Sequence, residues 1–507
     1  MINPIRAAAR SGIFPAALAI LGALGSVILP ALALQPDTST PAAGTPATPK
    51  SPDTRAGRML DTVLKALQSV DAPIPADRFS DTFQKAVPPD QVKLICTQII
   101  DQHGPIRLDG IQPGATADAL VAAVSGSKTG ERFEIVLGLD RDGRMETLLF
   151  RPAPRPDLPP FKDWAELDAA LTALAPPPAP EDKSPPSVMI NFGAFELKPA
   201  DDQKPDGPFK AEPIHTLNPD LRLAIGSTFK LYVLGTLGQA VLDGRAKWDE
   251  MLPIKTEHKS LPSGTMQDVP AGTEFPLSTY AEKMISISDN TATDHLIRRL
   301  SRSDLEDYMA ALHDQPKVNY PFLLTREMFA LKLSPDTSLM PRWDASGEAA
   351  RRDMLVYDDP ISPKRPAGRS HTPGEVFNTN PELKAAENWT RPRHIATIEW
   401  FATPVELARL FADLHRLEKT PGNEPLAKAL RLNPGLPLPS KTWPSVAFKG
   451  GSEPGVLNLT WMLTRDDGRT FVLTLGWNNT KAPLDESKLL EIAQRAIGLL
   501  RHHPARP

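Results

Sequence analysis

The sequence predicts an α+β protein with two folded parts, and three observations support this fold class. Residues 55–152 show helical patterns that are followed by strands. Residues 187–507 begin with a strand, continue through several amphipathic helices, and end with strands and a last helix. Proline-rich sequence at 153–186, with one short helical pattern, separates the two parts. A block of helices enclosed by strands is typical of a sheet covered by helices, with both ends of the segment joined in one sheet.

The small part, residues 55–152, is expected to be a separate α+β domain. In 59–70 and 89–102 the apolar residues recur with helical spacing. The strands predicted at 132–139 and 145–150 are joined by Asp-Arg-Asp-Gly, which is a strong hairpin signal. Helices packed on one face of an antiparallel sheet would bury these apolar positions.

Two features of the small part carry no predicted chemistry. Cys96, the only cysteine of the chain, lies in the apolar helical pattern and is interpreted as a buried core thiol. Residues 125–130, Ser-Gly-Ser-Lys-Thr-Gly, contain both a Ser-x-x-Lys and a Lys-Thr-Gly sequence. Their glycines stand between two strands, where a turn is expected, and a turn cannot place the serine and the lysine on one helical face.

The large part, residues 187–507, follows the same rules of apolar spacing. Its predicted helices are each marked by three- and four-residue apolar steps, at 231–242, 277–287, 291–300, 401–417 and 485–500. Its predicted strands are apolar or alternating runs bounded by turn residues, at 187–197, 445–448, 457–463 and 470–477. The interval 335–394 is rich in proline and mixed charges with little periodicity, and it is expected to be an insertion at the surface.

The first 34 residues predict export. Arg6 and Arg10 precede an apolar run at 13–32, and Ala-Leu-Ala at 31–33 is a small-x-small cleavage signature. Residues 1–34 are therefore interpreted as a secretory signal peptide, and the protein is expected to be periplasmic or secreted. If this segment is not cleaved, it would be a membrane tether. Residues 35–54, rich in Pro, Thr and Ala, are expected to be a disordered linker.

Composition excludes several other functions. A length of 507 residues suggests two or three domains, and a net charge of −4 favours neither nucleic acid nor an anionic membrane as a partner. The ten histidines show no ligand spacing, and the chain has no glycine-rich phosphate loop. No metal, nucleotide or other cofactor is predicted.

The pair Ser227 and Lys230 is the first candidate for chemistry. Both residues stand at the start of the helix predicted at 231–242. Residues three apart in a helix share one face, so the lysine amine can reach the serine hydroxyl. A serine needs a neighbouring base to become a nucleophile, and the backbone N–H groups of a helix start favour a developing oxyanion. A serine that only caps the helix is the alternative interpretation.

Two further motifs follow in the chain. Ser288-Asp289-Asn290 precedes the helix predicted at 291–300, where ordinary N-capping is the alternative role. Lys449-Gly450-Gly451 follows the strand predicted at 445–448. A Ser-x-x-Lys, a Ser-Asp-Asn and a Lys-x-Gly in this order form the signature of serine β-lactamases and penicillin-binding proteins.

On these motifs the large part resembles class A β-lactamase-like serine hydrolases. The chain as a whole resembles the two-domain members found in clavulanic acid gene clusters. In those proteins a small steroid-isomerase-like or cystatin-like α+β domain precedes a β-lactamase/transpeptidase-like domain. The resemblance implies an acyl-enzyme formed on a β-lactam or on a peptidoglycan-derived substrate, without a metal or other cofactor.

The resemblance also implies a role for each residue that matches a motif. Ser227 would be acylated, Lys230 would take its proton, and Ser288 would pass a proton to the leaving nitrogen. Lys449 would hold Ser288 and attract a substrate carboxylate. Four residues would bind the substrate: Asn290, Gly450, Gly451 and Ser452. Ser452 would also contribute its backbone N–H to the oxyanion hole.

Three departures from the family pattern concern substrate binding and turnover. Gly450 replaces the usual Thr or Ser, and no Glu-x-x-Leu-Asn occurs between Asn290 and Lys449. That glutamate would activate the deacylating water. Asp294 stands where the family usually has an asparagine. Glu327 is the nearest carboxylate that could replace the missing glutamate. It follows Arg326, however, and a structural ion pair is the more common role of an Arg-Glu sequence.

These observations lead to one prediction of function and two alternatives. We expect an exported serine hydrolase that acts by acyl transfer, with β-lactam hydrolysis as its activity. The first alternative is a D-alanyl-D-alanine peptidase or an esterase. The second is a β-lactam- or peptidoglycan-binding protein without turnover. The sequence separates this last class from the hydrolase only through the missing glutamate.

Overall fold

The computed structural model describes residues 49–504 apart from 88, 112–114, 131, 153–157, 177–184, 202, 204–206, 261–262, 334–337, 358–388 and 437. The chain divides into two compact units between Asp157 and Leu158. The expected signal peptide at 1–34 lies outside the described residues. Among the residues described, no helix is both long and apolar enough to cross a membrane.

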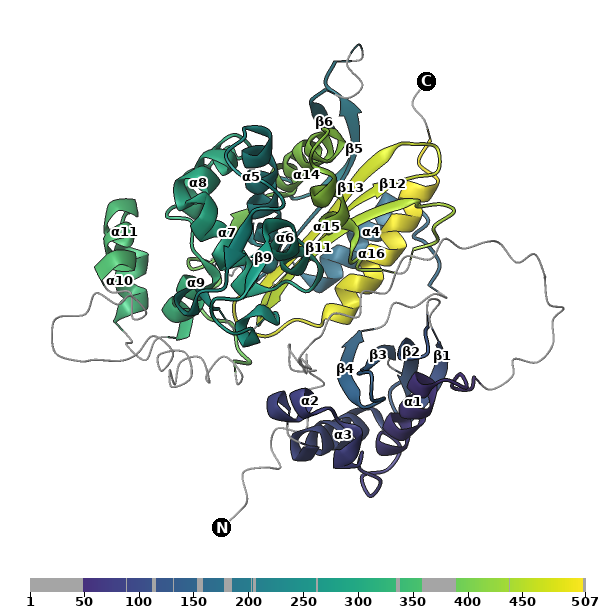
Figure 1. Ribbon diagram of the computed structural model, residues 1–507. Coiled ribbons are helices and arrows are strands. Elements are labelled where there is room, and N and C mark those ends of the chain that lie inside the picture. Colours follow the sequence, from purple (N-terminus) through teal and green to yellow (C-terminus); the bar gives the residue numbers. More distant parts are fainter. Residues whose placement is uncertain are drawn as a thin grey trace. The chain divides into compact units, whose positions relative to one another are not determined.

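The first unit packs helices on a four-stranded antiparallel sheet. The strand order is β1-β2-β3-β4, and β3 pairs with β2 through Val136 and Val121. The purple helices of Figure 1 cover the sheet, and side chains from α1, α3 and the strands form one core. The elements are α1 (Arg55–Ala66), α2 (Asp81–Ala86), α3 (Pro89–His103), β1 (Ile106–Ile111), β2 (Ala119–Gly126), β3 (Arg132–Leu139) and β4 (Met145–Pro152).

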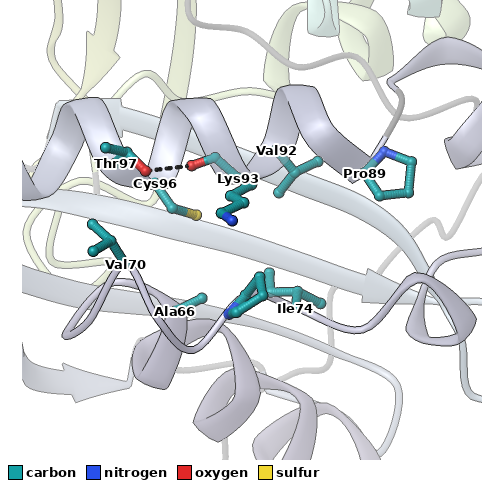
Figure 2. Close-up of a pocket in the computed structure, with 9 residues that line it drawn as sticks. Ala66, Val70, Ile74, Pro89, Val92, Lys93, Cys96 and Thr97 are labelled. Carbon is teal, nitrogen blue, oxygen red and sulfur yellow. Dashed lines mark hydrogen bonds between the residues drawn. The ribbon is translucent and has the colours of Figure 1, made fainter.

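The interpretation of Cys96 as a core thiol is confirmed. Figure 2 shows it on α3, facing a cavity that is also lined by Ala66 and Ile74. The cavity holds about 10 Å³, room for one water at most. Burial raises the pKa of the thiol to about 11, so Cys96 stays protonated and unreactive near neutral pH. The Ser-x-x-Lys at 125–128 lies at the end of β2 and in the turn that follows, as expected.

The second unit is built on a five-stranded antiparallel sheet in the order β11-β12-β13-β5-β6. The last strand of this unit, β13, therefore pairs with its first, β5, as the sequence predicts for this part. The strands are β5 (Val188–Pro199), β6 (Phe209–Leu217), β11 (Ser445–Glu453), β12 (Val456–Thr464) and β13 (Thr470–Asn479). A short pair beside the sheet joins β7 (Leu223–Ala224) to β10 (Phe401–Ala402).

Helices cover both faces of this sheet, as Figure 1 shows. Successive side chains of a strand point to opposite faces of the sheet, so Trp461 packs on one face and Met462 on the other. One face holds α4 (Trp164–Leu174) and α16 (Glu486–Arg501). The other face holds the larger helical layer: α5 (Lys230–Leu242), α6 (Leu277–Ser286), α7 (Asn290–Leu300), α8 (Arg302–Ala310), α9 (Thr325–Leu333), α14 (Pro404–Lys419) and α15 (Glu424–Arg431).

The structure contains elements that the sequence analysis did not predict, among them β6, α8 and α15, and it also differs from the prediction at the following points. Strand β11 does not end at 448 but continues to Glu453, because Lys449 and Gly451 pair with Thr460 and Asn458 of β12. Helix α14 begins at Pro404 rather than 401, because a capping box at Thr403 sets its start. The interval 335–394 contains α10 (Leu339–Ala345) and α11 (Glu348–Tyr357), and its residues 358–388 lie outside the described chain.

The proline-rich stretch at 153–186 contains α4, which packs on α16 and belongs to the second unit. Asp163 caps α4 by accepting a hydrogen bond from the N–H of Glu166 at 2.9 Å. Arg495 of α16 then pairs with the Glu166 carboxylate at 2.8 Å. These contacts attach the helix to the sheet of the second unit.

Candidate active site

The candidate nucleophile Ser227 lies in a tight turn between β7 and α5. The turn, Gly226–Phe229, has 3₁₀ geometry, and the α-helix begins only at Lys230. Gly226 enters the turn with a φ of +47°, a conformation that favours glycine. The turn leaves Ser227 partly exposed while Lys230 is fully buried, and the Oγ of Ser227 lies 3.2 Å from the Nζ of Lys230.

The amine of Lys230 is surrounded by oxygen atoms from a second segment. Its Nζ lies 2.6 Å from the carbonyl oxygen of Ser288, 2.9 Å from the Ser288 Oγ and 2.7 Å from the Oδ1 of Asn290. The carbonyl and the amide oxygen can only accept, so they take two hydrogens of the amine. In the neutral amine this leaves the lone pair for a hydroxyl proton.

Ser288 lies between two lysines. Its Oγ is 2.9 Å from the Nζ of Lys230 and 3.1 Å from the Nζ of Lys449. Its φ of +59° is unusual for a residue other than glycine and costs on the order of 1 kcal/mol. This conformation directs both the carbonyl and the hydroxyl of Ser288 to the amine of Lys230.

The Ser-Asp-Asn motif also has the capping role that the sequence allowed. The Oδ1 of Asp289 accepts from the N–H of Ala292 at 2.8 Å, and its Oδ2 accepts from Thr265 and Met266. This anchors the start of α7, where Asn290 is 3% exposed. The capping and the contacts to Lys230 are therefore made by neighbouring residues of one motif.

Strand β11 lies against the turn of Ser227, and glycines make this contact possible. A Cβ on Gly451 would lie 2.1 Å from the carbonyl oxygen of Ile225 and 2.4 Å from the backbone nitrogen of Ser227. A Cβ on Gly226 would lie 3.1 Å from the backbone nitrogen of Ser452. The backbone nitrogens of Ser227 and Ser452 thus belong to two segments in direct contact. Gly450 pairs with Leu459 of β12, on the opposite side of the β11 backbone from Lys449 and Gly451.

Burial lowers the pKa of both lysines of the site. Burial lowers the pKa of Lys230 to about 7, against the opposing pull of Asp289 and Asp294. Burial, together with the nearby Lys230, lowers the pKa of Lys449 well below its usual range. A neutral amine beside Ser227 is therefore well populated near neutral pH.

The start of α9 contributes contacts to the site that sequence reasoning missed. Asp294, one turn after Asn290, accepts hydrogen bonds from the N–H of Thr325 at 2.8 Å, from its hydroxyl at 2.7 Å, and from the N–H of Arg326 at 3.0 Å. It caps a helix 31 residues away in sequence. The sequence alone identified Asp294 as unusual, but it did not indicate that Thr325 and Arg326 are its partners.

The replacement carboxylate Glu327 is held by structural contacts. It accepts from Arg302 at 2.7 Å and from the N–H of Leu324 at 2.9 Å, and its side chain is 7% exposed. Among the described residues, no group of three His, Cys, Asp or Glu is placed to hold a metal ion.

An α+β fold that places a Ser-x-x-Lys turn against a Lys-Gly-Gly strand defines the class of β-lactamases and penicillin-binding proteins. A family model described as the beta-lactamase enzyme family matches residues 211–498, which is more than half of the chain. The protein therefore belongs to the beta-lactamase enzyme family. A second model, described as ORF 12 gene product N-terminal, matches residues 51–145, so the small unit is a domain of that type.

Comparison with solved structures returns beta-lactamases and the protein PBP-A, all at low identity. A beta-lactamase from Sphaerobacter thermophilus is 18% identical, with 66% of this chain and 96% of that chain covered at a TM-score of 0.41. The protein PBP-A is 15% identical, with 68% and 98% covered at a TM-score of 0.39. A beta-lactamase from Chitinophaga pinensis is 13% identical, with 66% and 98% covered at a TM-score of 0.39. No curated protein matches the sequence.

Proposed function

We propose that this protein is an exported serine hydrolase that forms an acyl-enzyme on Ser227, with a β-lactam as the substrate. The observation that carries the proposal is the Nζ of Lys230, which lies 3.2 Å from the Ser227 Oγ and has a pKa lowered by burial to about 7. A general base works best when its pKa is near the working pH.

In the proposed acylation the Ser227 Oγ attacks the lactam carbonyl carbon, and its proton passes to the Nζ of Lys230. The negative charge that develops on the carbonyl oxygen is stabilised by the backbone N–H groups of Ser227 and Ser452. The lactam C–N bond then breaks as the Ser288 hydroxyl gives its proton to the leaving nitrogen and takes in its place the proton held by the Nζ of Lys230, 2.9 Å away. Lys449, 3.1 Å from that hydroxyl, holds it in place.

Substrate binding is proposed for the residues around these groups. The side-chain amide of Asn290 would bind the substrate amide, and Lys449 would attract a substrate carboxylate. Gly450 offers no hydroxyl to that carboxylate, so the exposed Ser452 is the proposed substitute. Gly451 would contribute to substrate binding by letting β11 approach the turn of Ser227 closely, since any side chain there would meet that turn.

A second candidate function is a binding protein that is acylated but turns over very slowly. The contacts of Glu327 favour it, because a carboxylate held by Arg302 and by the N–H of Leu324 is a poor water-activating base. Without that base the acyl-enzyme would persist. The PBP-A family member has been solved as a penicillin G acyl-enzyme in a mutant form.

One experiment separates these functions. The purified protein is incubated with a chromogenic cephalosporin, and absorbance and intact mass are followed together. Steady turnover supports the hydrolase, and a stable mass adduct without turnover supports the binding protein. Rapid ester cleavage without either result would support a peptidase or an esterase. Ser227→Ala should abolish every adduct, and an adduct that survives this change would contradict the proposal.

For the small unit we propose a steroid-isomerase-like or cystatin-like domain. Helices on a four-stranded antiparallel sheet support this comparison. Export to the periplasm or the medium belongs to the same proposal and is supported by the pattern of residues 1–34. Mass spectrometry of the mature N-terminus tests it, and a protein that begins at Met1 in the soluble cell fraction would contradict export.

A further inference from the structure

Lys332, Glu399 and Glu453 form a buried ionic triad in the second unit. The Nζ of Lys332 lies 2.7 Å from the Oε1 of Glu399 and also contacts the carboxylate of Glu453. The side chains of Lys332 and Glu399 are 0% exposed and that of Glu453 is 6% exposed. The three residues come from α9, from the segment before β10 and from the end of β11.

The charges of the triad balance only if one carboxyl keeps its proton. Two carboxylates face one ammonium in a dry environment, where an uncompensated charge is costly. Burial and the charge of Glu399 raise the pKa of Glu453 well above its usual range, and the two carboxyl groups share a hydrogen bond, which requires a proton on one of them. The triad is then a neutral, hydrogen-bonded unit.

Glu453 of the triad lies on β11, the strand that contacts the turn of Ser227. Side chains alternate along β11, so Lys449, Gly451 and Glu453 point to the same side. Lys449 reaches Ser288, and the Cβ position of Gly451 points at the backbone nitrogen of Ser227. Glu453 is the next residue on this side.

Glu399 of the triad begins a segment that also contacts the turn of Ser227. Glu399 precedes Trp400, whose carbonyl oxygen accepts the N–H of Ile225 at 2.9 Å. The Trp400 ring stacks on Phe229 with 3.7 Å between ring centroids. The segment after Glu399 therefore contacts the turn at both of its ends, while the strand before Glu453 contacts it at Ser227.

We propose that the triad clamps β11 and the Trp400 segment around the turn of Ser227 and so fixes the spacing between the backbone N–H groups of Ser227 and Ser452. Lys332, Glu399 and Glu453 are then positioning residues for acylation, a role that rests on the proposed function of Ser227. They act through the backbone and do not touch the reacting atoms.

Two variants of Glu453 in the full-length protein test the clamp. Glu453→Gln keeps a neutral side chain that can donate to Glu399 and accept from Lys332. Glu453→Leu removes both hydrogen bonds but leaves Lys332 paired with Glu399. Acylation by a fluorescent penicillin is measured over a range of concentrations, which separates the initial binding constant from the acylation rate constant. We expect Glu453→Leu to lower the rate constant at least tenfold with less than a threefold change in binding, and Glu453→Gln to stay within threefold of the natural protein.

Glu196→Leu is the matched control. It breaks a buried, two-pronged ion pair with Arg469 on the same sheet, at 2.7 and 2.9 Å, away from the turn of Ser227. It should lower the melting temperature without changing the acylation rate constant. Equal rate constants for Glu453→Leu and the natural protein, or an equal loss in Glu196→Leu, would overturn the proposal.

Hydrogen exchange tests the clamp without any reaction. Amides in residues 225–229 and 449–453 should exchange at least tenfold faster in Glu453→Leu than in Glu453→Gln. If the natural protein is not acylated at all, the proposed function fails, and this exchange result alone decides whether the clamp exists. Unchanged exchange in Glu453→Leu would refute the clamp whether or not penicillin reacts.

Discussion

At the scale of single residues, the environment of Lys230 determines what Ser227 can do. An ammonium is stable in water but not in a fully buried position without a carboxylate in contact. The Nζ of Lys230 instead contacts a carbonyl oxygen, two hydroxyls and an amide oxygen. These groups orient the amine without fixing a full charge on it.

The first prediction concerns pH. Only the neutral amine of Lys230 accepts a proton, and its pKa is lowered to about 7. The acylation rate constant should therefore rise about tenfold per pH unit below 7 and level off above it. Stopped-flow measurement with a fluorescent penicillin between pH 5.5 and 8.5 checks this. A flat profile over that range would contradict Lys230 as the base.

The second prediction concerns Gly451. A methyl group there would meet the carbonyl oxygen of Ile225 at 2.1 Å, which is backbone and cannot rotate away. Gly451→Ala should lower the acylation rate constant more than tenfold and destabilise the second unit by about 1–3 kcal/mol. Gly347→Ala is the control, because nothing lies within 4 Å of its Cβ position. Acylation at the natural rate in Gly451→Ala would show that the strand is not pressed against the turn.

At the scale of elements, helix α7 joins the site to helix α9. Its first residue, Asn290, contacts Lys230, and Asp294 one turn later caps α9 at Thr325. Burial raises the pKa of Asp294 to about 6, above the usual value for an aspartate, and the hydrogen bonds from Thr325 and Arg326 only partly oppose this. The folded protein therefore holds this proton more tightly than the unfolded chain does.

The third prediction follows from the upward direction of the pKa shift of Asp294. The stability contributed by the raised pKa of Asp294 is complete below about pH 4 and is lost as the pH rises through about 6. Asp294→Asn should remove about 1–3 kcal/mol of this pH dependence. Urea unfolding at pH 4.5, 6 and 7.5 measures it by tryptophan fluorescence, since all eight tryptophans follow residue 158. Parallel pH curves for the two proteins would refute the prediction.

Sequence reasoning could predict most elements but few of the contacts between them. The helix at 485–500 and the strand at 470–477 were recoverable because their apolar spacing repeats, and the structure has α16 and β13 there. The extension of β11 to Glu453 was not recoverable, because glycines give no strand signal and only pairing with β12 orders them.

The candidate site was predicted as three motifs in order, and the structure brings five of their residues together: Ser227, Lys230, Ser288, Asn290 and Lys449. The contacts of Asp294 and the triad of Lys332 were not predictable. Both join residues at least 31 positions apart, and no periodicity links them.

At the scale of the whole molecule, the described residues of the two units form separate hydrophobic clusters, one in the first unit and one on each face of the sheet in the second. The first unit buries side chains of α1, α3 and its own sheet, and every candidate site residue lies in the second unit. Each unit therefore has its own hydrophobic core, as a domain does.

The fourth prediction concerns this division. A protease site inserted between Asp157 and Leu158 of the full-length protein should be cut without loss of acylation at Ser227. The rate constant after cleavage should stay within threefold of the value before it, measured with the same fluorescent penicillin. Uncut protein treated with inactivated protease is the control. A loss of more than tenfold would mean that the first unit supports the site.

The contact between Gly451 and the turn of Ser227 also limits how this protein can be redesigned. The walls of many binding sites can be reshaped by changing one side chain at a time. Here the wall is bare backbone on both sides, with no side chain between to trim or enlarge. Widening the space between β11 and the turn of Ser227 would therefore require a shift of the whole strand. Such a shift would have to come from changes at the residues that hold the end of β11 at Glu453.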